Sequence, residues 1–111
     1  MTESLPIALM LKSYAGDFAF AQRLVESFTR HNPEGLTLFC VVPSEDMPQF
    51  TPLSSPHVVV MDEAPFEKYF VTETLNGTRP GYINQEIVKL AFHELGLAEN
   101  YFCVDSDAVF I

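Results

Sequence analysis

Residues 86–111 read EIVKLAFHELGLAENYFCVDSDAVFI, and this stretch decides the fold class. Its first part carries apolar residues at spacings of three and four, which is typical of a helix with one buried face, and Gly96 is a suitable residue to end that helix. The apolar run Tyr101–Val104 then predicts a buried strand. Asp105 and Asp107 follow directly, so the sequence predicts a helix, a strand and a pair of acids in that order.

The rest of the chain alternates in the same way. Short apolar runs predict strands at residues 7–11, 36–42, 58–61 and 101–104. Amphipathic spacing predicts longer helices at residues 18–30 and 82–95, with short helical segments within 44–50 and 65–71. The expected buried face of the helix at 82–95 consists of Ile83, Ile87, Leu90, Ala91 and Leu95.

Strands that are apolar on both faces and alternate with helices predict an α/β, Rossmann-like fold with a mainly parallel sheet and helices on both faces. We expect the strand order 3-2-1-4, which reverses between the first and fourth strands. Right-handed crossovers bring the carboxyl ends of the strands to one edge, where ligands bind at the reversal point. The expected crevice therefore lies between Lys12-Ser13-Tyr14 and Asp105-Ser106-Asp107.

Asp105 and Asp107 are candidate ligands for a hard cation. In an extended backbone, side chains two residues apart point the same way, with Cα atoms roughly 6–7 Å apart. Two carboxylates in that arrangement can share one divalent cation at the mouth of a buried strand. The alternative is a pair of solvated acids in a tight turn.

Charge and composition restrict the function classes. The chain has 111 residues, 48% of them hydrophobic, and a formal net charge of −9, so we expect one globular domain or part of one. The negative field argues against nucleic acid and anionic lipid as partners, and an anionic substrate would need a metal ion or local donors. Cys40 and Cys103 lie in predicted strands and are expected to be reduced core thiols. Asp62 and Glu63, after the third strand, are expected to be solvated.

Both ends of the sequence carry information. The N-terminal residues MTESLPIALMLKS have no basic segment and only a short apolar run, so we predict no signal or membrane span, and a cytoplasmic protein. The last residues, Ala108–Ile111, are apolar to the end and predict a further buried strand. A domain that stops inside a buried strand is expected to be a fragment of a longer protein.

With both sides of the crevice identified, the chain resembles the nucleotide-binding half of a GT-A-type glycosyltransferase. The resemblance is carried by the opening IALMLKSYAGD and its helix, by the strand TLFCVVP, and by the ordered string at 86–111. It is similar to retaining enzymes of the glycogenin and bacterial galactosyltransferase kind, and to a group of uncharacterised bacterial glycosyltransferase-like proteins. The Asp-x-Asp motif of these enzymes corresponds to Asp105-Ser106-Asp107, and the lysine of the preceding helix to Lys89.

The resemblance implies that residues 1–111 form the donor-binding half of a single GT-A-like domain. Asp105 and Asp107 would bind Mn²⁺ or Mg²⁺, which would hold the diphosphate of a nucleotide-sugar donor, with a UDP-sugar favoured, for transfer to an unknown acceptor. Ser106 would lie against the ribose of the donor. Lys89 would reach the donor sugar or phosphate, the alternative being a solvated lysine near Glu86.

Further donor contacts are implied at the ends of two elements. The backbone at Lys12 and Ser13 would touch the nucleoside, and Tyr14 would stack on the base, unless it is a turn residue that packs on the first helix. Arg79 and Gln85 lie at the start of the helix that opens on the ligand edge, where anions are favoured, the alternative being a loop arginine and a surface glutamine. The resemblance identifies no catalytic residue in this chain.

Related enzymes complete the metal shell, and bind the acceptor, with residues of the second half of the domain. This chain lacks such a half, so we expect it to bind a nucleotide weakly and to catalyse nothing by itself.

Two other hypotheses remain open. The run FCVDSDAVFI also fits the first motif of haloacid-dehalogenase-type phosphatases, in which Asp105 would be the nucleophile and Asp107 a general acid. That motif ordinarily lies on the first strand of its domain, whereas three predicted strands precede it here. The third hypothesis is a non-catalytic module that binds a nucleotide or a partner, with self-association through an exposed sheet edge.

Overall fold

The computed structural model of the protein describes residues 5–74 and 76–110. In this part of the chain, the strands are β1 (Leu5–Lys12), β2 (Leu38–Val42), β3 (Val58–Asp62) and β4 (Ala98–Val104). The α-helices are α1 (Phe18–Arg30), α2 (Met47–Phe50) and α3 (Pro80–Ala91). Short 3-10 segments are η1 (Ala15–Asp17), η2 (Ser44–Asp46), η3 (Thr51–Leu53), η4 (Ala64–Tyr69) and η5 (Phe92–Leu95).

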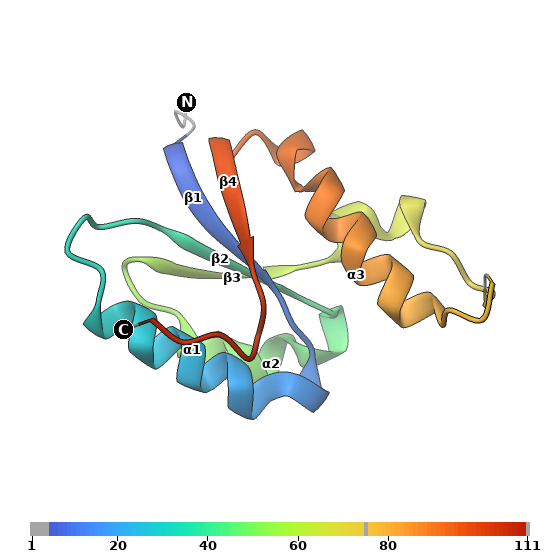
Figure 1. The fold of residues 1–111 in the computed structure, drawn as a ribbon, viewed down its shortest axis with the longest axis horizontal. Coiled ribbons are helices and arrows are strands. Elements are labelled where there is room, and N and C mark those ends of the chain that lie inside the picture. The colour runs from blue at the N-terminus through green and yellow to red at the C-terminus, as the bar shows by residue number, and fades with distance from the viewer. Residues whose placement is uncertain (1–4, 75, 111) are drawn as a thin grey trace.

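The strands form one parallel sheet in the order β3-β2-β1-β4 (Figure 1). This confirms the predicted α/β, Rossmann-like fold and the predicted strand order. Leu11 of β1 pairs with Cys40 of β2 on one side and with Val104 of β4 on the other. The order therefore reverses between β1 and β4, and the chain leaves both strands at the same edge of the sheet.

Helices cover both faces of the sheet. Alternate residues of β1 face opposite layers: Leu9 and Leu11 belong to the apolar cluster beneath α1, whereas Ala8 and Met10 belong to the cluster beneath α3. Figure 1 shows α1 below the sheet and α3 beyond its other face. The buried stripe of α1 consists of Ala21, Leu24, Val25, Ser27 and Phe28.

The face that helix α3 turns to the sheet agrees only in part with the predicted one: Ala91 and Leu95 pack against the buried cluster, whereas Leu90 does not. Val88 is its fully buried residue, and Phe92, one turn later, is buried in η5. Leu90 is 76% exposed. A helix turns by about 100° per residue, so Leu90 cannot face the sheet together with residues two positions before and after it. The prediction was wrong for Leu90 because several apolar stripes on this helix compete, and contact with β1 and β4 selects one of them.

The described residues after β4, which end at Phe110, do not form the predicted additional strand, and Ile111 lies outside the described residues. The Ala108 amide donates to the Asp105 carbonyl oxygen at 3.0 Å, which closes a turn. The following residues cross to α1, where the Phe110 amide donates to Ser27 Oγ at 2.9 Å and the Phe110 ring lies edge-on to Phe28. Figure 1 shows this red segment returning over α1. The apolar end of the described chain thus covers a helix instead of extending the sheet.

The two cysteines have different environments. Cys40 lies in the centre of β2, and its burial raises the pKa of the thiol to about 12. Cys103 lies on the edge strand β4 and is exposed, so the prediction of two core thiols was wrong for Cys103. Within 5–74 and 76–110, no helix has the length and apolar character that crossing a bilayer requires.

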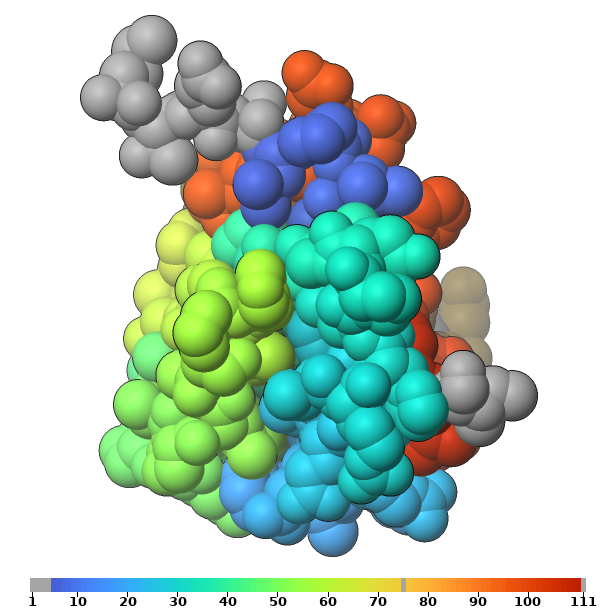
Figure 2. Space-filling model, turned by 90° about the vertical axis from the view of Figure 1, so that its left-hand side faces the viewer, coloured from blue at the N-terminus to red at the C-terminus, as the bar shows by residue number. Residues whose placement is uncertain are grey.

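The amino end of the sheet is closed by connecting segments. The His57 carbonyl accepts a hydrogen bond from the Leu38 amide at 2.8 Å, which ties the segment before β3 to the start of β2. Figure 2 shows the α1–β2 connection and the chain before β3 lying side by side on this face. The opposite, carboxyl edge is the one at which the predicted crevice lies.

Candidate functional site

The loops after β1 and β4 meet at the point where the strand order reverses. Ser106 Oγ donates to Ser13 Oγ at 3.3 Å, and both residues are buried. Small side chains at these two positions let the loops approach closely. The two segments that the sequence assigns to one crevice are therefore in contact there.

Two cavities open along this edge. The first, which we call the aspartate cavity, has a volume of about 350 Å³, and its predicted site residues are Lys12, Gln85, Lys89, Asp105, Ser106 and Asp107. The second, which we call the aromatic cavity, has a volume of about 500 Å³, and its predicted site residues are Lys12, Tyr14, Arg79 and Gln85. Lys12 and Gln85 line both cavities, so the two adjoin.

Asp105 and Asp107 lie in a turn and not in the extended backbone assumed from the sequence. The hydrogen bond from Ala108 to Asp105 bends the chain immediately after β4. Ser106 is buried between two exposed acids, and both acids line the aspartate cavity. The alternative of a tight turn is therefore correct for the backbone. Asp105 and Asp107 nevertheless line the same cavity.

Lys89 extends from α3 to the first of these acids. Its Nζ lies 3.3 Å from Asp105 Oδ1 and 3.4 Å from Glu86 Oε1. Burial alone would lower the pKa of Lys89, but the carboxylates of Glu86 and Asp105 outweigh it, and the net pKa is raised. Lys89 therefore carries a charge beside Asp105, where it would compete with a metal ion and could contact an anion that the metal holds.

The donor set of the aspartate cavity fits a hard divalent cation for which the protein would supply only some of the ligands. Mg²⁺ is commonly bound through one or two carboxylates, with substrate phosphates and water as the other ligands. Asp105 and Asp107 supply two carboxylates. Among the described residues, no group of three or more His, Cys, Asp or Glu side chains is placed to hold a metal ion. Substrate oxygens and water would have to complete the coordination.

Lys12 is ion-paired within the protein and does not project freely into the crevice. Its side chain is 5% exposed, and Nζ lies 3.0 Å from Glu63 Oε1 and donates to the Ser13 carbonyl at 2.9 Å. Lys12 ends β1 and Glu63 follows β3, so the two long side chains bridge across the end of β2. The expectation that Glu63 is solvated was wrong, because its side chain is only 15% exposed and lines the aromatic cavity.

Asp62 is partly exposed to solvent, and protein groups also bind its carboxylate. Its Oδ1 accepts hydrogen bonds from Ser44 Oγ at 2.7 Å and from the Ala64 amide at 2.8 Å. In a similar contact, the Asp46 carboxylate accepts the Ala15 amide at 2.9 Å. These acids tie neighbouring loops together at the carboxyl edge and are part of its framework.

Aromatic rings form much of the wall of the aromatic cavity. Tyr14 is partly exposed, and its ring lies over Gly16, where a Cβ would clash with it. Phe70 and Tyr82 also line the cavity. Exposed rings around a pocket offer flat apolar faces for stacking.

The start of α3 forms the other wall. Arg79 is exposed at the N-cap position, and Gln85 lies one turn into the helix. The Asn84 side chain accepts a hydrogen bond from the Val71 amide at 2.9 Å and donates one to the Val71 carbonyl at 3.1 Å. These two bonds hold the chain before α3 against the helix.

Several residues that line the two cavities are absent from the predicted site, among them Asp17, Glu63, Phe70 and Asn84. One signal was available for Glu63, namely that it follows one strand directly while a lysine ends another. No local pattern indicates Asn84 or Phe70, because their roles depend on where the loop before α3 lies.

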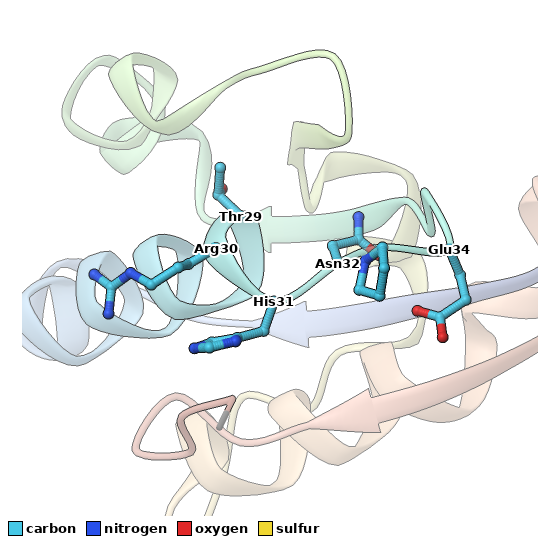
Figure 3. Close-up of a pocket in the computed structure, with 6 residues that line it drawn as sticks. Thr29, Arg30, His31, Asn32 and Glu34 are labelled. Carbon is cyan, nitrogen blue, oxygen red and sulfur yellow. The ribbon is translucent and has the colours of Figure 1, made fainter.

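A separate hollow at the other end of the sheet carries no comparable arrangement. It is lined by Thr29, Arg30, His31, Asn32, Pro33 and Glu34. Figure 3 shows Arg30 and Glu34 at opposite ends of this group of residues, so their charged side chains do not converge. The Asn32 amide group bonds the Leu36 backbone at 2.8 and 2.9 Å, so it serves the connection between α1 and β2.

The fold and the crevice together define an α/β, Rossmann-like protein. Its candidate site consists of two adjoining cavities where the strand order reverses. Residues 2–111 match the family of unknown function DUF6492, and the chain belongs to this family. Comparison with curated proteins and with solved structures gives no match.

Proposed function

We propose that this chain is the donor-binding portion of a glycosyltransferase, which binds a nucleotide-diphosphate sugar through Mn²⁺ or Mg²⁺ and transfers the sugar to an acceptor that is not yet identified. Cys40 and Cys103 are both unpaired thiols, which is consistent with a cytoplasmic location, and that location is part of the proposal.

The observation that carries the proposal is the pair of adjoining cavities at the reversal point. One cavity has two exposed carboxylates beside a charged lysine, and the other has aromatic walls. A nucleoside diphosphate has the same two parts, an anionic diphosphate and a flat base. In a chain with a formal net charge of −9, the diphosphate requires a cation as a bridge.

Each residue has a defined role in the proposal. Asp105 and Asp107 hold the cation, which when bound neutralises charge on the leaving nucleoside diphosphate. Lys89 supplies a point charge to the donor phosphate or sugar. The start of α3, with Arg79, favours anionic groups, and the Tyr14 ring stacks on the base.

Three further residues position these groups. Ser106 and Ser13, through their mutual contact, hold the acid-bearing turn against the end of β1. Gln85 lies where the two cavities meet, and its amide offers hydrogen bonds to the ribose or to the first phosphate.

Calorimetric titration tests the proposal directly. UDP and GDP are titrated with and without Mn²⁺ into wild type and into the double variant Asp105→Ala/Asp107→Ala. We expect metal-dependent binding of a nucleotide to wild type and its loss, by at least about a hundredfold, in the double variant, because both protein ligands of the metal are removed.

The matched control is Glu26→Ala/Glu34→Ala, which also removes two exposed acids but lies away from the crevice. It should bind as wild type does. Equal weakening of nucleotide binding in both double variants would show that the change in net charge alone causes the effect, and it would contradict the proposed site. Absence of metal-dependent binding in folded wild type would contradict the proposal for this chain.

A second candidate is a non-catalytic module that binds a nucleotide or a partner. The exposed outer edge of β4, with Phe102 at 59% exposure, favours it because such an edge can pair with another chain, including a second copy. Metal-dependent nucleotide binding without transfer or hydrolysis of any sugar nucleotide would support this candidate. The phosphatase alternative instead predicts Mg²⁺-dependent hydrolysis of p-nitrophenyl phosphate that is lost in Asp105→Asn.

A further inference from the structure

We infer that the aromatic cavity selects guanine, so that the donor is a GDP-sugar. This inference rests on the proposed function and specifies its substrate class. The resemblance to known glycosyltransferases favours uracil, whereas the hydrogen-bonding groups of Lys12 and Glu63 favour guanine.

The ion-paired side chains of Lys12 and Glu63 line the aromatic cavity with charged hydrogen-bonding groups. Lys12 Nζ has three N–H groups, of which one faces Glu63 Oε1 at 3.0 Å and one is donated to the Ser13 carbonyl at 2.9 Å. We assign the third N–H to the ligand. The Glu63 carboxylate has two acceptor oxygens, so the order inferred for recognition is donor, acceptor, acceptor.

Guanine is the base whose pairing edge complements this order. Its edge reads acceptor at O6, donor at N1 and donor at the 2-amino group. Uracil reads acceptor, donor, acceptor, which would set its second carbonyl against a carboxylate oxygen. Cytosine presents donor, acceptor, acceptor, which is the order of the protein groups, so like groups would face each other. Adenine offers one donor beside one acceptor. Only guanine satisfies all three positions.

Burial gives this match its selectivity. The side chains of Lys12 and Glu63 are 5% and 15% exposed, so water competes weakly for them. A buried charged group left without a partner costs more than a matched hydrogen bond gains, and sites of this kind reject ligands that lack the matching group. Tyr14 and Phe70, which line the same cavity, offer flat faces for the purine ring.

The arrangement is compatible with the acid-bearing turn. Lys12 and Gln85 line both cavities, so a base beside Lys12 lies at the border of the aspartate cavity. The diphosphate of the same nucleotide can then extend toward Asp105 and Asp107.

The first test compares ligands and needs no variant. GDP, IDP and UDP are titrated calorimetrically into the wild-type chain with Mn²⁺. IDP differs from GDP only by the missing 2-amino group, so it leaves one Glu63 oxygen unmatched. We expect IDP and UDP to bind at least about tenfold more weakly than GDP, since hydrogen bonds to charged groups carry discrimination of that order or more.

Equal affinities for GDP and IDP, or tighter binding of UDP than GDP, would overturn the inference and leave the proposed function standing. Failure of all three nucleotides to bind with Mn²⁺ would reject the proposed function, and the inference with it.

The second test assigns the preference to Glu63. Glu63→Gln keeps the shape of the side chain but replaces one acceptor by an N–H₂ donor, so the ratio of GDP to IDP affinity should fall to within about threefold of unity. Glu67→Gln removes an equal charge from an exposed position in η4, the segment that follows Glu63, and should keep the wild-type ratio. Thermal melting establishes that both variants are folded. An unchanged ratio in folded Glu63→Gln would overturn the assignment.

Discussion

The sequence predicts β2 and β4 alike, as short apolar strands, but the two strands have very different environments in the structure. All five residues of β2 are buried, because β1 and β3 flank it and helices cover both of its faces. None of the seven residues of β4 is fully buried, because it lies at the edge of the sheet. The stable part of the molecule is thus centred on β2, whereas the acids of the candidate site follow the less protected strand.

The largest expected difference between these regions concerns apolar packing. Phe28 of α1 is 2% exposed in the cluster that contains Cys40 and Val42 of β2, whereas Phe102 of β4 is 59% exposed. We expect Phe28→Ala to lower the free energy of unfolding by about 3–5 kcal/mol, because it removes a buried ring and leaves a cavity. Phe102→Ala should cost less than about 1 kcal/mol, in line with the small effects of exposed positions.

Urea unfolding followed by circular dichroism measures both values. A loss for Phe102→Ala as large as that for Phe28→Ala would show that another chain covers β4 in solution. Dependence of that loss on protein concentration would then identify self-association.

The second comparison concerns the two thiols at alkaline pH. Burial raises the pKa of Cys40 from its ordinary value of 9.0 to about 12. Above the lower value the unfolded chain loses a proton that the folded chain keeps, so stability falls as pH rises and the loss continues up to about pH 12. Linkage gives a loss of about 1.4 kcal/mol for each pH unit in this window.

Cys40→Ala should therefore remove about 1.4 kcal/mol of the stability difference between pH 8 and pH 10, as measured by urea unfolding at both values. Cys103→Ala is the matched control. Burial also raises the pKa of Cys103, but this thiol is exposed, and its replacement should change the pH dependence much less. Equal pH dependence in wild type and Cys40→Ala would contradict the assignment to the β2 thiol.

The smallest expected effect concerns the contact between Lys89 and Asp105, which follows β4. Lys89 contacts Asp105, whose side chain is 76% exposed, and such a pair contributes less than about 1 kcal/mol to stability. Lys89→Met removes a cation that competes with a metal ion. Binding of Mn²⁺ alone should therefore tighten by about twofold to fivefold, whereas binding of the nucleotide in the presence of Mn²⁺ should weaken because a phosphate partner is lost.

Titration of Mn²⁺ with and without nucleotide measures this opposite pair of shifts. Lys68→Met, which removes an exposed lysine of η4, should leave both affinities unchanged. Parallel weakening of both affinities in Lys89→Met would point to a merely structural role for Lys89.

Much of the fold was predictable because it depends on local patterns. The apolar runs of the four strands and the amphipathic stripe of α1 place the strands and the first helix within a few residues of their observed bounds. The parallel order 3-2-1-4 was predictable as well. The contact between Ser13 and Ser106 follows from that order, since neighbouring parallel strands end at the same edge.

The errors share a physical cause, which is that they concern packing between distant segments. Leu90 and Cys103 are as apolar as residues that are buried elsewhere, but α3 turns another stripe to the sheet and β4 has a neighbour on one side only. Glu63 was expected to be solvated because its immediate neighbours suggest a loop. Its partner Lys12 lies 51 positions earlier in the sequence and two strands away.

The sequence by itself determined the class of fold, the edge of the sheet that carries the site and the pair of acids at that edge, because strand periodicity and parallel topology follow from local residue patterns. Tertiary structure decided how those residues are presented. It set the acids in a turn, placed Lys89 against Asp105, and brought Lys12 and Glu63 together at a cavity with aromatic walls. The turn is a local contact, whereas the two ion pairs join residues 16 and 51 positions apart in the chain, which the pairing of the strands and the packing of α3 on the sheet bring together.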